Sequence, residues 1–127
     1  MKFKRECDLL FHKAEQDLEL AKLAIDSKKI DSEQILFHLQ QSAEKYIKSL
    51  LSFLKIEFPK THDIDSLISI LKAQLPSLPE YTDSFVDLSD YAVEGRYSFV
   101  IDPEIDAKDY VEKLHDFSMF VHNFISK

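Results

Sequence analysis

ILFHLQQSAEKYIKSLLSFLK, residues 35–55, is the most regular stretch of the chain, and PKTHD follows it at residues 59–63. On a helical wheel the apolar side chains of the first segment fall within an arc of roughly 160°. These side chains are Leu36, Leu39, Ala43, Tyr46, Ile47, Leu50, Leu51, Phe53 and Leu54. An arc this broad predicts a central helix, at about 32–56, rather than a surface helix. Pro59 stops its continuation, and Thr61 or Asp63 is expected to cap the next helix.

Polar side chains on the same helix mark one edge of it. Gln40 falls inside the apolar arc, and a buried amide is tolerated only when it is hydrogen-bonded, so we expect a specific partner for it. Gln41, Glu44 and Lys48 follow i, i+3, i+7 spacing and share an edge. Two interpretations stay open: a solvated edge with an ion pair inside the helix, or a polar site beside the core.

The rest of the chain predicts further helices and no sheet. Its 127 residues suit one domain, 1–127, and 45% of them are apolar, which is typical of a globular protein. A single glycine leaves little room for the tight hairpins of an all-β fold. Helical periodicity appears at about 3–26, 64–75, 80–94 and 103–126, the last with Asp102 as N-cap and Pro103 in the first turn. We therefore predict an all-α, up-and-down bundle of four long helices and one short one.

Composition narrows the classes of function. The formal net charge of −7 argues against a broad nucleic-acid surface, and no DNA partner is expected. Cys7 is the only cysteine, so neither a disulfide scaffold nor a cysteine-rich zinc site can form. The histidines lack the spacing of a metal site, and one glycine cannot build a glycine-rich phosphate loop, so neither a metal nor a cofactor is expected. No apolar run resembles a signal peptide or a membrane span, so a cytoplasmic location is expected and no membrane partner.

Several separated segments together resemble the HEPN family, the higher eukaryotes and prokaryotes nucleotide-binding domain. They are FHLQQSAEKYIK at 37–48, THD at 61–63 and GRYS at 95–98, preceded by AEQDL at 14–18 with alanines at 21 and 24. The resemblance implies an all-α bundle that forms a homodimer. It also implies a nucleotidyltransferase partner, often within a toxin–antitoxin pair, and a nucleotide or RNA as ligand.

The resemblance also implies which polar positions recur at the family's site. In this chain they are Gln41, Glu44, Lys45, Lys48, His62, Asp63, Arg96 and Tyr97. Many members are metal-independent ribonucleases that carry an arginine followed, after four to six residues, by a histidine. No histidine follows Arg96 at that distance, so the usual acid/base group is absent there. Arg5 and His12 fit the spacing numerically, but they lie at the start of the first helix, where the family does not place the motif.

Three functions remain open at this point. The first is a HEPN-type module that dimerises, acts with a nucleotidyltransferase and binds a nucleotide or RNA phosphate. The second is a ribonuclease toxin in which Arg96 acts with a non-standard histidine, for which His62 is the candidate. The third is a structural helical adaptor whose polar residues serve only as caps and ion pairs. The identity of the ligand and of the partner does not follow from the sequence, nor does the face that would form a dimer.

Overall fold

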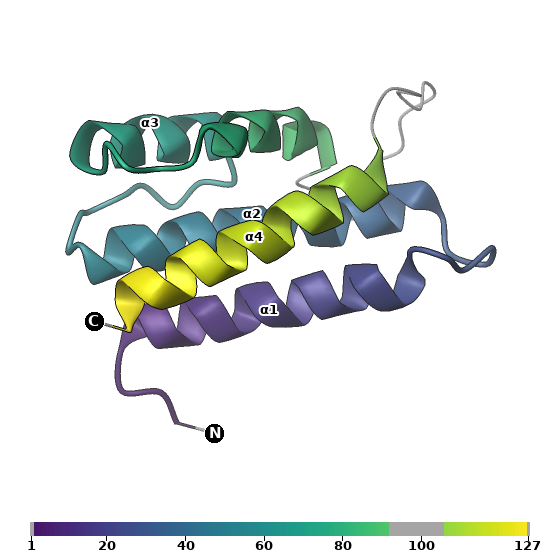
Figure 1. The fold of residues 1–127 in the computed structure, drawn as a ribbon, viewed down its shortest axis with the longest axis horizontal. Coiled ribbons are helices and arrows are strands. Elements are labelled where there is room, and N and C mark those ends of the chain that lie inside the picture. The colour runs from purple at the N-terminus through teal and green to yellow at the C-terminus, as the bar shows by residue number, and fades with distance from the viewer. Residues whose placement is uncertain (1, 92–105, 127) are drawn as a thin grey trace.

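The computed structural model describes residues 2–91 and 106–126 and contains no strand within them. Its elements are α1 (Glu6–Ala24), α2 (Ser32–Phe53), α3 (Ile64–Gln74), the 3-10 helix η1 (Glu80–Tyr91) and α4 (Ala107–Ile125). Figure 1 shows α1, α2 and α4 side by side, with α3 and η1 together along one side of α2. The predicted all-α fold is confirmed.

Helix α2 lies at the centre of the bundle and contacts every other element that the structure describes. The predicted apolar arc is its core face: seven of the nine side chains are buried, while Phe53 and Leu54 are half-buried at the end of the helix. The seven are Leu36, Leu39, Ala43, Tyr46, Ile47, Leu50 and Leu51. Against them pack Leu18 of α1, Leu67 of α3, Phe85 of η1 and Phe117 of α4, all in one hydrophobic cluster. Burying apolar area on all sides is what makes α2 the organising helix.

The end of α2 is set by backbone geometry before Pro59 is reached. The N–H of Ile56 donates to Leu51 O at 2.9 Å and that of Lys55 to Ser52 O at 3.0 Å, while Lys55 has a φ of 58°. This pattern is a Schellman motif, which requires a left-handed residue just after the helix. The helix therefore ends at Phe53, three residues earlier than the predicted position near 56.

Aspartates occupy the N-cap positions of α2, α3 and α4, and two of them form the capping bond. Asp63 caps α3, because its carboxylate accepts from the N–H of Asp65 at 3.2 Å. Asp31 occupies the N-cap position of α2, but its side chain makes no capping hydrogen bond. Helix α4 begins at Ala107, where the Asp106 carboxylate accepts from the N–H of Lys108 at 3.0 Å and so caps it. Asp102 and Pro103, predicted at the start of this helix, lie outside the described residues.

The segment predicted as a helix over 80–94 is wound as a 3-10 helix over Glu80–Tyr91. Two of its hydroxyl groups bond to carbonyls three residues back: Thr82 to Pro79 O at 2.6 Å and Ser84 to Tyr81 O at 2.6 Å. Such local bonds compete with the i to i−4 pattern of an α-helix. Gly95 follows this segment, at the position where a C-terminal cap of the predicted helix is expected, and lies outside the described residues.

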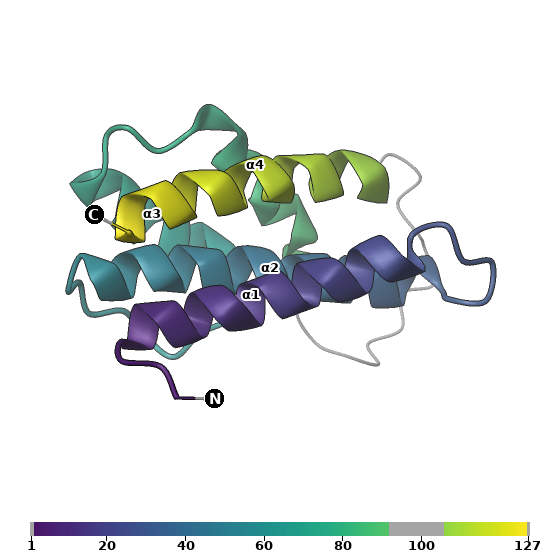
Figure 2. The same ribbon diagram turned by 60° about the horizontal axis from the view of Figure 1, so that its bottom comes forward.

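Helices α1 and α4 run antiparallel and close the bundle (Figure 2). Two contacts fix this direction: the guanidinium of Arg5 donates to Ile125 O at 3.0 Å, and the rings of Phe11 and His122 have centroids 5.8 Å apart. In the described part of the chain, none of the helices has the length and apolar character needed to cross a membrane.

Candidate functional site

The connection from α2 to α3 brings a histidine back onto α2. Residues 54–63 return along the helix, so that His62 lies beside Gln40 and Glu44, about three turns before α2 ends. The side chain of Gln40 is fully buried and donates to His62 O at 3.3 Å. Gln40 thus has the specific partner that its place in the apolar arc required.

Glu44 is the centre of this cluster. Its side chain is only 4% exposed, and its two carboxylate oxygens accept from three donors. Nζ of Lys48 lies 3.0 Å from Oε2, while Nε2 of Gln40 and Nδ1 of His62 lie 3.2 Å and 2.9 Å from Oε1. Gln41 joins at the rim by donating to Oε1 of Gln40 at 2.6 Å. Of the two interpretations of this edge, the structure supports a polar cluster beside the core.

The cluster consists of a largely buried ion pair, Glu44 and Lys48, and an exposed imidazole, that of His62. The ammonium of Lys48 compensates the Glu44 carboxylate, and it also lies 6.0 Å from the ring centre of Phe58. The side chain of Lys48 is 14% exposed, whereas that of His62 is 64% exposed. His62 is therefore the member of the cluster that meets solvent.

The bond to Glu44 also fixes which nitrogen His62 presents outward. A carboxylate only accepts, so the hydrogen lies on Nδ1. The other ring nitrogen, Nε2, is then free to accept or donate a proton at the surface. An imidazole oriented through Nδ1 by a carboxylate is the arrangement that catalytic triads use to position a general base.

Lys45, predicted at the same site, belongs to a different cluster, which lies about 100° around α2 from Glu44. Its ammonium lies 2.5 Å from Oδ2 of Asp17, and Nδ1 of His38 lies 3.0 Å from Oδ1 of the same carboxylate. Asp17 belongs to α1, so this cluster joins α1 to α2. Each flank of α2 thus carries one nearly buried carboxylate that is held by a lysine and a histidine.

Asp17 and His38 were missed as paired residues by sequence reasoning. His38 is one of the histidines without the spacing of a metal site, and Asp17 lies in the AEQDL segment at 14–18, so neither was assigned a partner. The available signal was the i, i+7 spacing of His38 and Lys45, which places both on one edge of α2. Reading that signal requires knowing which residue of α1 faces the edge.

The remaining predicted site residues divide into one with a structural role and two outside the description. The Asp63 carboxylate accepts from the N–H of Asp65 and from the hydroxyl of Ser66 at 2.7 Å, so it acts as a cap beside the cluster. Arg96 and Tyr97 lie outside the described residues, and their roles remain predictions. Arg5, the other arginine, pairs with Asp8 at 2.8 Å, which raises its pKa and lowers that of Asp8.

The described residues contain no group of three His, Cys, Asp or Glu side chains arranged to hold a metal ion. Glu44 and Asp17 each meet one histidine and one lysine, and a lysine ammonium occupies the side where a cation would bind.

Comparisons with known proteins agree with the geometry of the fold. The family model of the HEPN domain matches residues 7–126. A solved structure of an archaeal HEPN homologue is similar with a TM-score of 0.60 and 23% sequence identity, over 98% of this chain and 97% of that one. At this identity the likeness concerns the fold alone. No curated protein matches the chain.

Proposed function

Because the chain belongs to the HEPN domain family, we propose that it binds the phosphate of RNA or of a nucleotide through His62, at the edge between α2 and α3. In this proposal it acts as a homodimer beside a nucleotidyltransferase partner, in a toxin–antitoxin type of pair. The supporting observation is the exposed imidazole of His62, oriented by the buried carboxylate of Glu44.

The charges of the cluster favour a single outward contact. The ammonium of Lys48 is paired with the Glu44 carboxylate, so it adds no unpaired positive charge at the surface. The imidazole of His62 is then the group of the cluster that faces solvent and can contact an anion there. Asp63 already accepts from the N–H of Asp65, so the phosphate contact falls on the imidazole rather than on the end of α3.

A second function, a metal-independent ribonuclease, is favoured by the same bond. With Nδ1 held by Glu44, Nε2 can take the proton of the attacking 2′-hydroxyl group or return one to the leaving oxygen. Arg96 would then supply the positive charge that stabilises the phosphate in the transition state. This function replaces the missing histidine after Arg96 with His62, which follows α2 instead.

RNA binding and RNA cleavage in the presence of EDTA separate these functions. The wild type is compared with His62→Ala, Glu44→Gln and Arg96→Ala, and with His115→Ala as matched control, since His115 is an exposed histidine of α4. Binding of a labelled oligoribonucleotide is followed by fluorescence polarisation, and cleavage on gels.

For the binding module we expect no cleavage, and an affinity about tenfold lower for His62→Ala, which corresponds to about 1.4 kcal/mol. For the ribonuclease we expect cleavage that His62→Ala and Arg96→Ala abolish and Glu44→Gln reduces. Absence of RNA and nucleotide binding by the wild type would overturn both functions, as would equal effects of His62→Ala and His115→Ala. The structural adaptor would then stand.

A further inference from the structure

A groove follows the contact between α1 and α4, on a part of the bundle where neither helix contacts α3. Two cavities open along it, with volumes of about 370 Å³ and 420 Å³. The first is lined by Phe11, Glu15, Ser118, Met119, His122 and Asn123. The second is lined by Lys22, Val111, Glu112, His115 and Asp116. Because the helices are antiparallel, the two cavities succeed each other along one groove.

The charge of this groove is negative. Glu15 lines the first cavity, and Glu112 and Asp116 line the second, while the only ammonium among the lining residues is that of Lys22. That ammonium lies 3.5 Å from the carboxylate of Glu19, on the same helix. Such a groove repels phosphate groups and attracts cationic ones.

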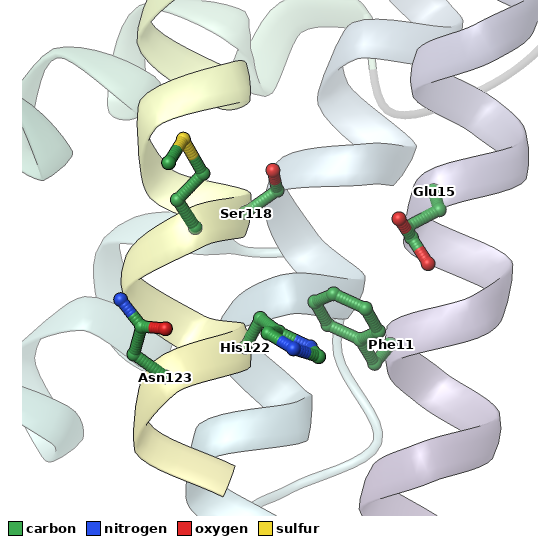
Figure 3. A pocket seen from close by; sticks show the side chains of 6 residues that line it. Phe11, Glu15, Ser118, His122 and Asn123 are labelled. Carbon is green, nitrogen blue, oxygen red and sulfur yellow. The ribbon is translucent and has the colours of Figure 1, made fainter. Parts of the chain in front are cut away.

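Glu15, like Glu112 and Asp116, is a carboxylate of the groove that finds no hydrogen-bond or ion-pair partner among the described residues. Figure 3 shows its side chain extending from α1 towards the space beside α4. Within residues 2–91 and 106–126 it makes no hydrogen bond and no ion pair, in contrast to Asp17 two positions along the same helix. A free carboxylate at the wall of a cavity is an acceptor for an N–H-bearing cation.

The floor beside Glu15 is aromatic. The rings of Phe11 and His122 have centroids 5.8 Å apart (Figure 3). The Tyr46 ring meets that of Phe11 edge to face, with 5.5 Å between their centroids. The side chain of Met119, 55% exposed, forms part of the α4 wall. A planar cation can therefore rest on an aromatic face while its N–H groups reach Glu15.

We propose that the α1–α4 groove binds a basic segment of a partner protein, with one arginine side chain seated over Phe11 and paired with Glu15. A guanidinium is planar, stacks on aromatic rings and binds a carboxylate through two parallel N–H groups. A nucleotide fits the groove less well, because its phosphates would approach Glu112, Asp116 and Glu15. A second copy packed groove to groove is disfavoured, because it would bring one acidic groove against another.

The probe is an amphipathic helical peptide that carries one arginine per turn, and its control is the same peptide with citrulline, which keeps the shape of arginine and removes the charge. Binding is measured by two-dimensional NMR of the labelled protein. We expect saturable shifts at Phe11, Glu15 and His122 with the arginine peptide. The affinity of the Glu15→Gln variant should be about tenfold lower. Glu80→Gln, an exposed carboxylate variant in η1, should bind as the wild type does.

Each other outcome overturns the proposal. Equal binding of the citrulline peptide, or equal binding by Glu15→Gln, would show that no guanidinium–carboxylate pair forms. Shifts at these residues with guanosine monophosphate but not with the peptide would assign the cavity to a base. A change in oligomeric state of Glu15→Gln without loss of peptide binding would assign it to a second copy. The experiment involves no residue of the His62 cluster, so it is independent of the proposed RNA function.

Discussion

Replacing Glu44 by alanine removes the acceptor on which three donors converge, and we expect a large loss of stability. Lys48 contributes most of it: its side chain is 14% exposed, so its ammonium would remain largely buried without a counter-charge. Removing one partner of a buried ion pair costs about 3–5 kcal/mol, and the partial exposure of Lys48 places this pair at or below the lower limit, at about 2–3 kcal/mol.

The other two donors add little. His62 is 64% exposed and regains water, which makes its contribution about 0–1 kcal/mol. The amide of Gln40 keeps its bond to His62 O. The expected loss is therefore about 3 kcal/mol, which lowers the midpoint of thermal unfolding by roughly 10 °C for a chain of this size.

Urea unfolding followed by circular dichroism at neutral pH measures this free energy, provided that the slope of the transition is unchanged. Glu57→Ala is the matched control, since Glu57 is exposed and should lie within about 0.5 kcal/mol of the wild type. A double-mutant cycle of Glu44→Gln and Lys48→Met should give a coupling of about 1–2 kcal/mol. A loss for Glu44→Ala below about 1 kcal/mol, or a coupling near zero, would refute the assignment of Glu44 as the centre of a buried ionic cluster.

Three further effects follow from the structure. Asp63→Ala should lose about 1 kcal/mol in urea unfolding because α3 loses its N-cap, and Asp65→Asn, which keeps the cap, should change it by less than half as much. Lys55→Gly should raise the free energy of unfolding by about 0.5–1 kcal/mol, because glycine adopts the left-handed conformation at φ 58° without strain. Lys55→Val should lower that free energy. The same loss in both variants would contradict this prediction. Burial, with Asp116 as a second cause, raises the pKa of Tyr81 from 10.0 to about 12. Since the folded pKa is the higher one, the contribution of this phenol is complete below about pH 10 and is lost as the pH rises through 12. Tyr81→Phe should therefore show a shallower fall in stability between these values, and an unchanged fall would exclude the effect.

The sequence was sufficient for the class of fold and for the core face of α2, because apolar periodicity reports directly on burial. It also predicted that Gln40 needs a partner and that Glu44 and Lys48 share an edge. The segment at 80–94 was predicted as an ordinary helix, whereas residues 80–91 form a 3-10 helix. Apolar periodicity carries no information on hydroxyl groups that bond to carbonyls three residues back. The choice between Thr61 and Asp63 as the cap of α3 stayed open, because residue type alone does not show at which residue a helix begins.

The clusters on α2 were only partly predictable, and for a geometric reason. A helical wheel ranks the residues of one helix around its own axis, but it does not give the rotation of the next helix. Asp17 meets Lys45 across 28 positions of sequence, and His62 reaches Glu44 only because residues 54–63 run back along α2. The family resemblance supplied His62 as a candidate where periodicity had no information.

The antiparallel contact of α1 with α4 also has a consequence for the order of assembly. The bond from Arg5 to Ile125 O joins positions 120 apart in the chain, whereas Ser42 reaches Ala14 O across only 28. Closing a longer loop costs more entropy, so the hairpin of α1 and α2 can form early while α4 docks late. The same contact would be among the first to open in the native protein. A molecule bound in the α1–α4 groove would hold the first and last helices together and slow the unfolding of the whole bundle.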